Sequence, residues 1–302
     1  MYKKKRPAAG TDAESEPPDF CYHCGDPPHT HMNTAAKLRK LEGILQGLGK
    51  AVVAFSGGVD STFLAAAAER ALGDGALAIT AVSASLARSE RKEAAALAKR
   101  IGIRHVAFKT DELNDELFTA NSAERCYHCK KIRFKALLGW AAARGYPWVL
   151  EGSNVDDDRD YRPGRRALAE LRGVRSPLEE AGLTKAEIRD ASRRWRLPTW
   201  KKPSAACLSS RIEYGLPQTP ERLGQVEEAE EFIRKRCRGQ LRVRHHGTLA
   251  RIEVEPEWIP RLAQPAAARQ IVRKLKQLGF HHVALDLSGY RMGSLNQDIG
   301  KK

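Results

Sequence analysis

The stretch AVVAFSGGVDSTFLAAAAERAL, at residues 51–72, constrains the fold more than any other part of the chain. AVVAF (51–55) is a short apolar run typical of a buried strand, and TFLAAAAERAL has the alanine content of a helix. Between them, Gly57 and Gly58 permit a tight turn and a close approach of the backbone to an anion. N–H groups at the start of a helix favour phosphate. We therefore predict a nucleotide-binding loop made of Ser56, Gly57, Gly58, Asp60, Ser61 and Thr62.

Asp60 is unusual in a loop that binds anions, because a carboxylate repels phosphate unless a cation lies between them. Mg²⁺ bound to pyrophosphate oxygens is the natural cation, so we predict that Asp60 is a magnesium ligand. The chain contains no G-x-x-x-x-G-K-[ST] sequence, which excludes a Walker-type loop. The alternative is a glycine-rich turn between strand and helix that binds nothing.

Strands and helices alternate on both sides of this loop. Leucines spaced by three and four residues predict a helix before it, over 38–48. After it, strands are expected at 76–83, 104–110 and 148–153, and helices at 89–102, with Ser89 as N-cap, and 129–145. Thr184 and Glu187 have the spacing of a capping box for one more helix. This alternation predicts an α/β domain with a parallel sheet covered on both faces, over residues 34–203.

The pattern changes after Pro203. Thr219 and Pro220 begin a predicted helix, and LRVRHH and TLARIEV, separated by Gly247, predict a hairpin. A helix over roughly 257–278 and a strand at HVALDLS follow. We therefore expect a smaller α+β domain at 204–302. Residues 1–33 have few aliphatic side chains and are expected to form a flexible leader.

The net charge of +15 and the pI near 9.7 favour an anionic partner, although an ordinary basic surface would give the same values. No run of 18 apolar residues predicts a membrane span, and the first residues lack the apolar region of a secretory signal. We therefore expect a cytoplasmic protein whose six cysteines are reduced. Cysteines at C-x-x-C spacing then indicate metal or redox sites before disulfides.

The tetrapeptide CYHC occurs twice, at 21–24 and 126–129. In the second copy, Cys126 and Cys129 share one face of a predicted helix, where the helix start and nearby basic residues should favour thiolates. Two thiolates make an incomplete metal site. The candidate third thiol is Cys207, in KKPSAACLSSRIEYG, between Lys201, Lys202 and Arg211. A small buried thiol is the alternative for Cys207.

The sequence S-G-G-x-D-S resembles the PP-loop of ATP pyrophosphatases, which cleave ATP between the α and β phosphates and transfer AMP to a substrate oxygen. Five further stretches resemble the LarE family of ATP-dependent sulfur transferases: PSAACLSSRIEYG, RCYHCK, EGSNVDDDRDYRPG, VRHHGTLARIEV and LDLSGYRMGS. The resemblance runs from about residue 35 to 297. It implies a Rossmann-like PP-loop domain and a smaller C-terminal domain for substrate binding and oligomerisation. It also implies adenylation of the carboxylates of pyridinium-3,5-biscarboxylic acid mononucleotide and their conversion to thiocarboxylates in nickel-pincer cofactor biosynthesis.

The LarE family uses two sulfur chemistries. One form has a single cysteine at the position of Cys207, which gives up its own sulfur, and the other has three cysteines that hold a [4Fe–4S] cluster. This chain resembles the second form, with Cys126, Cys129 and Cys207 as the implied cluster ligands. The resemblance implies ATP, Mg²⁺ and the cluster as cofactors, and a homo-oligomer. It leaves the sulfur donor open.

Several other polar residues are candidates for substrate or metal binding. Arg242 and Arg244 alternate along a strand and so share one face, where with Arg211 they are expected to hold the carboxylate and phosphate of the substrate; an exposed sheet face is the alternative. Glu253, on the paired strand, is expected to orient these arginines or to handle protons, and a surface charge pair is the alternative. Asn154, Asp157 and Asp160 follow a strand end and are candidates for binding Mg²⁺ or substrate, with a solvated acidic loop as the alternative. Candidates for zinc are Cys21, Cys24, His29 and His31. Cys237 has no partner at metal spacing.

Two other functions fit part of the sequence. A PP-loop tRNA sulfur transferase would suit the positive charge, but aromatic residues are sparse at 7% and no known RNA-binding module is present. A non-catalytic nucleic-acid-binding protein stabilised by metal would suit the basic leader and the two CYHC copies. The intact SGGVDST loop favours an enzyme over that second alternative.

Overall fold

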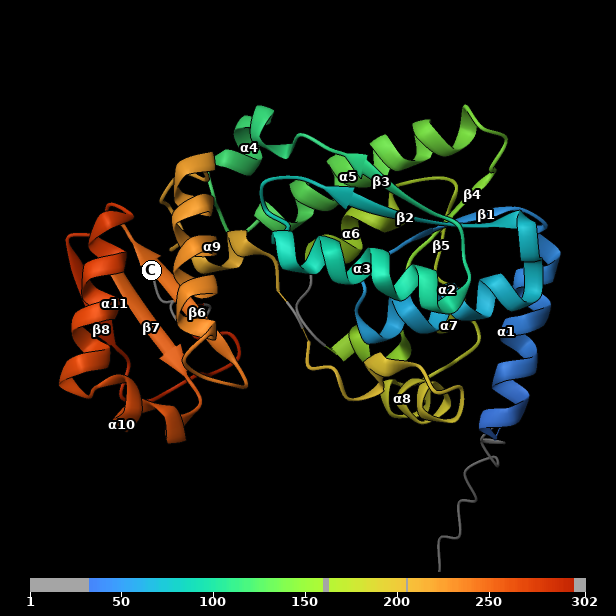
Figure 1. Ribbon diagram of the computed structural model, residues 1–302. Helices are drawn as coiled ribbons and strands as arrows, with labels where there is room; N and C mark the ends of the chain where they lie inside the picture. Colours follow the sequence, from blue (N-terminus) through green and yellow to red (C-terminus); the bar gives the residue numbers. More distant parts are fainter. Residues whose placement is uncertain (1–32, 160–162, 205, 296–302) are drawn as a thin grey trace, which may run out of the picture.

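The computed structural model describes residues 33–159, 163–204 and 206–295. Five parallel strands form the larger sheet, in the order β3-β2-β1-β4-β5 (Figure 1). Their bounds are β1 Ala51–Ala54, β2 Ala76–Val82, β3 His105–Lys109, β4 Trp148–Leu150 and β5 Val174–Arg175. The predicted parallel α/β domain is therefore confirmed, and strand order reverses between β1 and β4.

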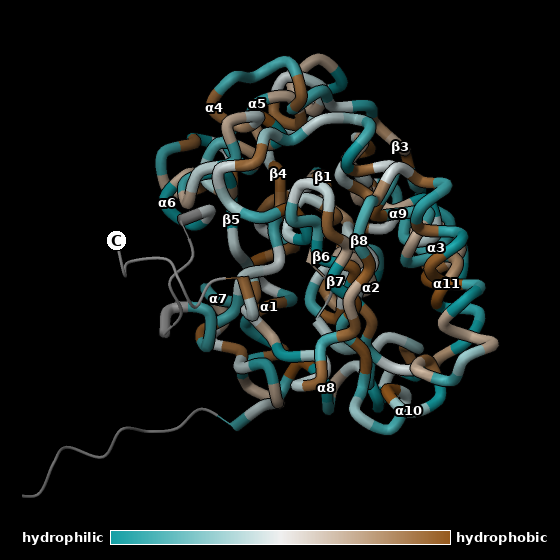
Figure 2. Tube along the Cα trace, turned by 90° about the vertical axis from the view of Figure 1, so that its left-hand side faces the viewer, coloured by the Kyte–Doolittle hydropathy of each residue, from teal (hydrophilic) through white to brown (hydrophobic). Residues whose placement is uncertain are grey.

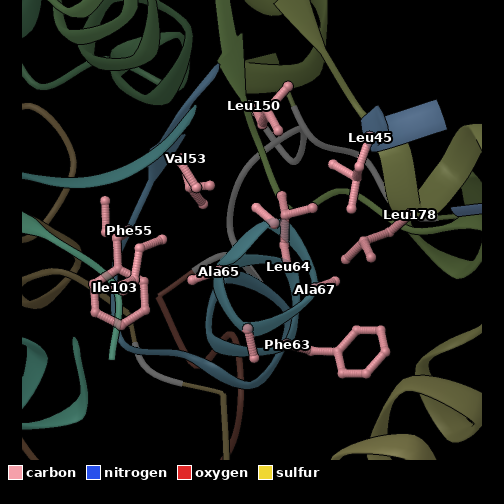
Figure 3. Close-up of a cluster of buried hydrophobic side chains, with 14 of the residues drawn as sticks. Leu45, Val53, Phe55, Phe63, Leu64, Ala65, Ala67, Ile103, Leu150 and Leu178 are labelled. Carbon is pink, nitrogen blue, oxygen red and sulfur yellow. The ribbon is translucent and has the colours of Figure 1, made fainter. Parts of the chain in front are cut away.

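Helices cover both faces of this sheet (Figure 1). They are α1 Thr34–Leu48, α2 Val59–Leu72, α3 Arg88–Ile101, α4 Glu116–Thr119, α5 Arg125–Ala142, α6 Pro163–Ala169, α7 Pro177–Glu180 and α8 Lys185–Arg194. Because side chains alternate along a strand, Val53 packs with α1, α2 and α8, whereas Val52 packs with α5. Figure 3 shows the first of these cores, in which side chains of α1, α2, α7, β1 and β4 meet around Leu64.

The second sheet has three strands in the order β6-β7-β8. Its elements are α9 Pro220–Arg234, β6 Leu241–His246, β7 Leu249–Val254, α10 Ile259–Leu262, α11 Pro265–Gln277 and β8 His282–Leu285. β6 and β7 form the predicted antiparallel hairpin, and β8 runs parallel to β7. Apolar side chains of α9, α11 and the three strands form a separate core. In Figure 2, hydrophobic segments gather around α2 and β4, and the outer turns are mostly hydrophilic.

Local predictions were confirmed in most places and wrong in two. The capping box of Thr184 and Glu187 is present at α8. Ser89 is not an N-cap, because α3 begins one residue earlier and its N-cap, Ala87, provides no side-chain hydrogen bond. The single helix expected over 257–278 is divided into α10 and α11, since Pro265 has no N–H for a continuous helix and begins the second one. No helix within the described ranges is both long and apolar enough to cross a bilayer.

His245 gives the smaller core a measurable pH dependence. Its ring is buried, its Nε2 lies 2.9 Å from Gln225 Oε1, and burial lowers its pKa to about 4. Because the folded pKa lies below the unfolded value, the stabilisation is complete above about pH 6.5 and is lost as the pH falls towards 4. We expect the free energy of unfolding to fall by about 2 kcal/mol more between pH 7.5 and pH 5 in the wild type than in His245→Gln. Urea denaturation at both pH values measures this difference, and equal losses in the two proteins would contradict the prediction.

Candidate active site

The phosphate loop lies between β1 and α2, as the sequence predicted. Gly57 has φ +70°, a left-handed conformation that favours glycine, and Gly58 is the N-cap of α2. Ser56 Oγ accepts from the N–H of Gly58 at 3.3 Å and lies 3.0 Å from Ser61 Oγ. These contacts hold the loop closed around the N-terminus of a helix, which is a ready site for phosphate.

The loop occupies the point where the strand order of the sheet reverses, between β1 and β4. Open α/β sheets bind ligands at this point, beyond the carboxyl ends of the strands. Gly152, just after β4, approaches the loop closely: a Cβ there would lie 3.2 Å from both the Ser61 nitrogen and Asp60 Cβ. A larger residue would require the loop to move by a few tenths of an ångström. Sequence analysis missed Gly152 because its role depends on strand order.

Asp60 has the surroundings of a cation ligand. One carboxylate oxygen pairs with Lys185 Nζ, whereas the other, Oδ1, is buried and has no hydrogen-bond partner among the residues that the structure describes. Burial raises the pKa of Asp60, Lys185 lowers it, and the carboxylate of Asp157 raises it further. Two carboxylates close to one another and an unpartnered oxygen at a phosphate loop suit Mg²⁺. Sequence analysis did not find Lys185, which reaches the loop from the first turn of α8.

Asn154 and Asp157 form one small structure beyond β4. Asp157 Oδ2 accepts from the backbone N–H and from the side-chain amide of Asn154, at 3.2 Å in both cases. Asn154 is buried, and the Asp157 carboxylate that it binds acts electrostatically on Asp60. Asp160, which was predicted with them, lies outside the described residues.

A pocket of about 430 Å³ is lined both by the phosphate loop and by Cys129 of α5. Ser56, Gly58, Asp60 and Ser61 line one side, and Cys129 lines another. The other residues that contribute are Ala54, Phe55, Ile79, Thr80, Ala81, Leu86, Lys130, Arg133, Phe134, Leu137, Glu151, Gly152, Ser153 and Asp157. An adenine nucleotide held here would lie within the same pocket as a thiol.

The fold brings Cys126, Cys129 and Cys207 together from two segments. Cys126 and Cys129 lie in the first turn of α5, and the thiols of Cys126 and Cys207 both act electrostatically on Cys129. Arg125, Arg133 and Arg211 also interact electrostatically with Cys207. Within the described ranges, however, no three His, Cys, Asp or Glu side chains are placed to hold a metal ion.

The expectation that the helix start favours thiolates was wrong for Cys129. Burial raises the pKa of this thiol to about 12, and the nearby Cys207, Glu112 and Cys126 also raise it, whereas Arg133 lowers it. Removal from water therefore outweighs the helix dipole and the basic neighbours. Cys126, at the same helix start, is exposed.

Arg133 is a site residue that sequence analysis missed. Its guanidinium donates to Ser83 Oγ at 2.9 Å and Ser85 Oγ at 2.8 Å, and it forms an ion pair with Glu112. The carbonyl of Ser85 in turn accepts from the N–H of Leu208 at 2.9 Å, which ties the segment of Cys207 to the larger sheet. Arg133 lies one helical turn after Cys129, a spacing that was available in the sequence.

A second cleft, of about 600 Å³, lies between α3 and α9, next to the segment that carries Cys207. Arg211 and Arg242 line it and are both buried, so the alternative of an exposed sheet face was wrong. Arg211 pairs with Glu230 at 3.0 Å and donates to the carbonyl of Cys207 at 2.8 Å. These contacts place it between the cleft and the third cysteine.

Arg244 does not join this cleft. It donates to Glu253 Oε2 at 3.0 and 2.8 Å and to the carbonyl of Ser210 at 3.1 Å. Glu253 is fully buried and also accepts from Ser294 Oγ at 2.7 Å. The predicted orienting contact of Glu253 is therefore present, but it fixes Arg244 in the interior.

The remaining cysteines divide into two groups. Cys237 is buried in the smaller core, where burial raises its pKa and its Sγ lies 3.6 Å from the carbonyl of Ile233. This environment makes it a packing residue. The predicted zinc ligands Cys21, Cys24, His29 and His31 lie outside the described residues.

The comparisons agree with this geometry. The asparagine synthase family, a PP-loop ATP pyrophosphatase domain, matches residues 45–129, which hold the phosphate loop and the second CYHC. An uncharacterized protein of Synechocystis is 44% identical over 88% of this chain and 99% of its own length. An uncharacterized protein of Methanocaldococcus jannaschii is 30% identical over 80% of this chain and 91% of its own length.

The fold and phosphate loop define an ATP-utilising enzyme of the PP-loop ATP pyrophosphatase class. The pyridinium-3,5-bisthiocarboxylic acid mononucleotide synthase of Lactiplantibacillus plantarum is 36% identical over 88% of this chain and 96% of its own length. This chain belongs to the LarE family, that of the pyridinium-3,5-bisthiocarboxylic acid mononucleotide synthases.

Proposed function

We propose that this enzyme replaces carboxylate oxygens of pyridinium-3,5-biscarboxylic acid mononucleotide with sulfur, using ATP, in nickel-pincer cofactor biosynthesis. The observation that carries the proposal is the shared pocket: Cys129 lines the same 430 Å³ cavity as the phosphate loop, and its thiol interacts with those of Cys126 and Cys207. Activation by ATP and delivery of sulfur are thereby possible at one place. The relative from Lactiplantibacillus plantarum is named for the corresponding bisthiocarboxylic product.

In the first step, a substrate carboxylate oxygen attacks the α-phosphorus of ATP, the bond to the bridging oxygen breaks, and pyrophosphate leaves. We infer that the N–H groups of Gly57 and of the first turn of α2 hold the phosphates and that Oδ1 of Asp60 binds the Mg²⁺ of the incoming Mg·ATP. Lys185, released from Asp60 by that cation, is then available to the phosphates. The product is an acyl-adenylate.

In the second step, sulfur attacks the acyl carbon, and AMP leaves with the former carboxylate oxygen. We infer that Arg133, held by Glu112 and two serines beside Cys129, stabilises the negative charge that develops there. The chemistry requires reduced thiols, and we propose that the enzyme acts in the cytoplasm.

The three cysteines have the donor set of a [4Fe–4S] cluster, and we propose that they hold one. A cluster takes one thiolate for each iron, so its ligands need not surround a single point as those of one metal ion do. The three arginines that interact with Cys207 offset the negative charge of such ligands. When bound, the cluster would supply an iron without a protein ligand, at which sulfide can be delivered.

We assign substrate binding to the smaller domain, residues 204–302, and ATP binding to residues 34–203. Arg242 and Arg211 line the cleft between α3 and α9 and would hold the anionic groups of the nucleotide. Arg244 has a supporting role, since its donors are used by Glu253 and Ser210. We also propose that the enzyme forms a homo-oligomer. The proposed reaction does not depend on which molecule donates the sulfur.

The decisive experiment is an anaerobic assay with ATP, the bis-carboxylate mononucleotide and sulfide. We expect one AMP, one pyrophosphate and one thiocarboxylate for each carboxylate converted, measured by chromatography and mass spectrometry. Release of AMP that does not depend on the mononucleotide would contradict the proposal. Thiolation of tRNA with strongly salt-dependent binding would favour the tRNA sulfur transferase instead.

A further inference from the structure

The cleft between α3 and α9 contains more acidic side chains than binding of an anion requires. Six glutamates line it, beside the basic residues already described. Five of them have partners in the described part of the chain: Glu93 with Lys202, Glu227 and Glu231 with Arg88, Glu230 with Arg211, and Glu255 with the N–H of Gln240. The sixth, Glu90, is left to be explained.

Glu90 lies in the first turn of α3 and its side chain is half-buried. It makes no hydrogen bond or ion pair with any residue in the described ranges, although Arg211, Lys202 and Arg242 all act on it electrostatically. Burial raises the pKa of Glu90, and Arg211 and Lys202 lower it. A partly desolvated carboxylate without a direct partner is unfavourable unless a ligand supplies one.

Arg242 is its counterpart in the same cleft. The guanidinium is buried, donates to the carbonyl of Leu241 at 2.7 Å and lies 5.1 Å from the ring centroid of Tyr290. No carboxylate among residues 33–159, 163–204 and 206–295 forms an ion pair with Arg242. The cleft therefore presents one negative and one positive group that are each unpaired and do not pair with each other.

A ligand that satisfies both groups must carry both charges. A nucleotide with a pyridinium ring does so, because the ring nitrogen bonded to ribose is permanently cationic and the carboxylates and phosphate are anionic. We propose that Glu90 pairs with the cationic ring of the substrate while Arg242 holds an anionic group, which makes Glu90 the residue that selects a charged ring. This inference rests on the proposed function and adds a determinant of specificity to it.

The test compares two ligands and three proteins. The ligands are pyridinium-3,5-biscarboxylic acid mononucleotide and its neutral isostere, the C-nucleotide with a benzene-3,5-dicarboxylate ring. The proteins are the wild type, Glu90→Gln and Glu231→Gln. Glu231 lines the rim of the same cleft and pairs with exposed Arg88, so its substitution removes the same charge without touching the proposed contact. Calorimetry measures the dissociation constants of the two ring ligands and of ATP for each of the three proteins.

We expect Glu90→Gln to weaken binding of the pyridinium ligand about tenfold and to leave the neutral isostere and ATP unchanged. Glu231→Gln is expected to bind the pyridinium ligand, the neutral isostere and ATP as tightly as the wild type does. Equal weakening of both ring types by Glu90→Gln, or no weakening of either, would overturn the assignment. A wild type that binds neither ring but binds ATP would overturn the proposed function itself, which separates the two failures.

Discussion

The Asp60→Asn variant is expected to lose AMP and pyrophosphate formation by at least about 100-fold. Asparagine keeps the size of the side chain but removes the charge that Mg²⁺ requires at the unpartnered, buried Oδ1. The ion pair with Lys185 is lost at the same time. Because the size of the side chain is kept, the variant separates the need for a charge at this position from the shape of the loop. Initial rates of pyrophosphate release at saturating ATP measure the effect.

Folding and metal-free binding serve as controls for this variant. Burial raises the pKa of Asp60, so its charged form destabilises the folded state and an uncharged side chain is tolerated there. We expect the variant to unfold within a few degrees of the wild type and to bind ATP without Mg²⁺ at least as tightly. Asp74→Asn, at an exposed position in the turn before β2, is the matched substitution and is expected to keep full activity. If Asp60→Asn released pyrophosphate at the wild-type rate, the assignment of Asp60 as a magnesium ligand would be refuted.

Replacing Cys207 with alanine is expected to abolish thiocarboxylate formation while adenylation continues. Cys207 lies next to three arginines and acts on Cys129, so it belongs to the same unit as the two cysteines of α5. Residues that act as one unit have non-additive effects. Cys126→Ala, Cys129→Ala and the triple variant are therefore each expected to lose as much sulfur transfer as Cys207→Ala, about 100-fold or more, together with the visible absorption of the proposed cluster.

Cys237→Ala is the control for the thiol variants. It removes a thiol packed in the smaller core, so we expect full sulfur transfer and a loss of about 1 kcal/mol in the free energy of unfolding. Intact-mass measurement of the wild type after turnover decides between the two sulfur chemistries. Loss of the elements of H₂S from Cys207 would show that the residue gives up its own sulfur and would contradict the cluster.

Sequence patterns predicted the fold well where local rules control it. The alternation of strands and helices, the loop at Ser56 and the capping box at Thr184 all depend on neighbours in the sequence, and the structure confirmed them. The break at Pro265 was missed, although proline was its visible cause. Here the spacing of apolar residues was given more weight than the missing N–H.

The site was harder to predict because its contacts cross between elements. Register pairs Arg242 with Glu253 across the hairpin, yet Glu253 pairs with Arg244 and Arg251, and alternation along a strand cannot reveal this choice. Lys185 reaches Asp60 across 125 residues, and Gly152 touches the loop only because β4 lies beside β1. Burial likewise reversed the expected acidity of Cys129, and burial is a property of the whole fold.

The chain on either side of Cys207 is anchored to the larger domain at one point before the residue and one point after it. Lys202 Nζ donates to the carbonyl of Gly57 at 2.9 Å, and the N–H of Leu208 donates to that of Ser85. The Cys207 thiol is therefore mechanically attached to the larger sheet, although its position in the sequence falls within the smaller domain expected at 204–302. Chimeras of related enzymes should accordingly be joined after Arg211, so that the three cysteines are inherited together with Glu90, and only the part of the cleft contributed by α9 and β6 is exchanged.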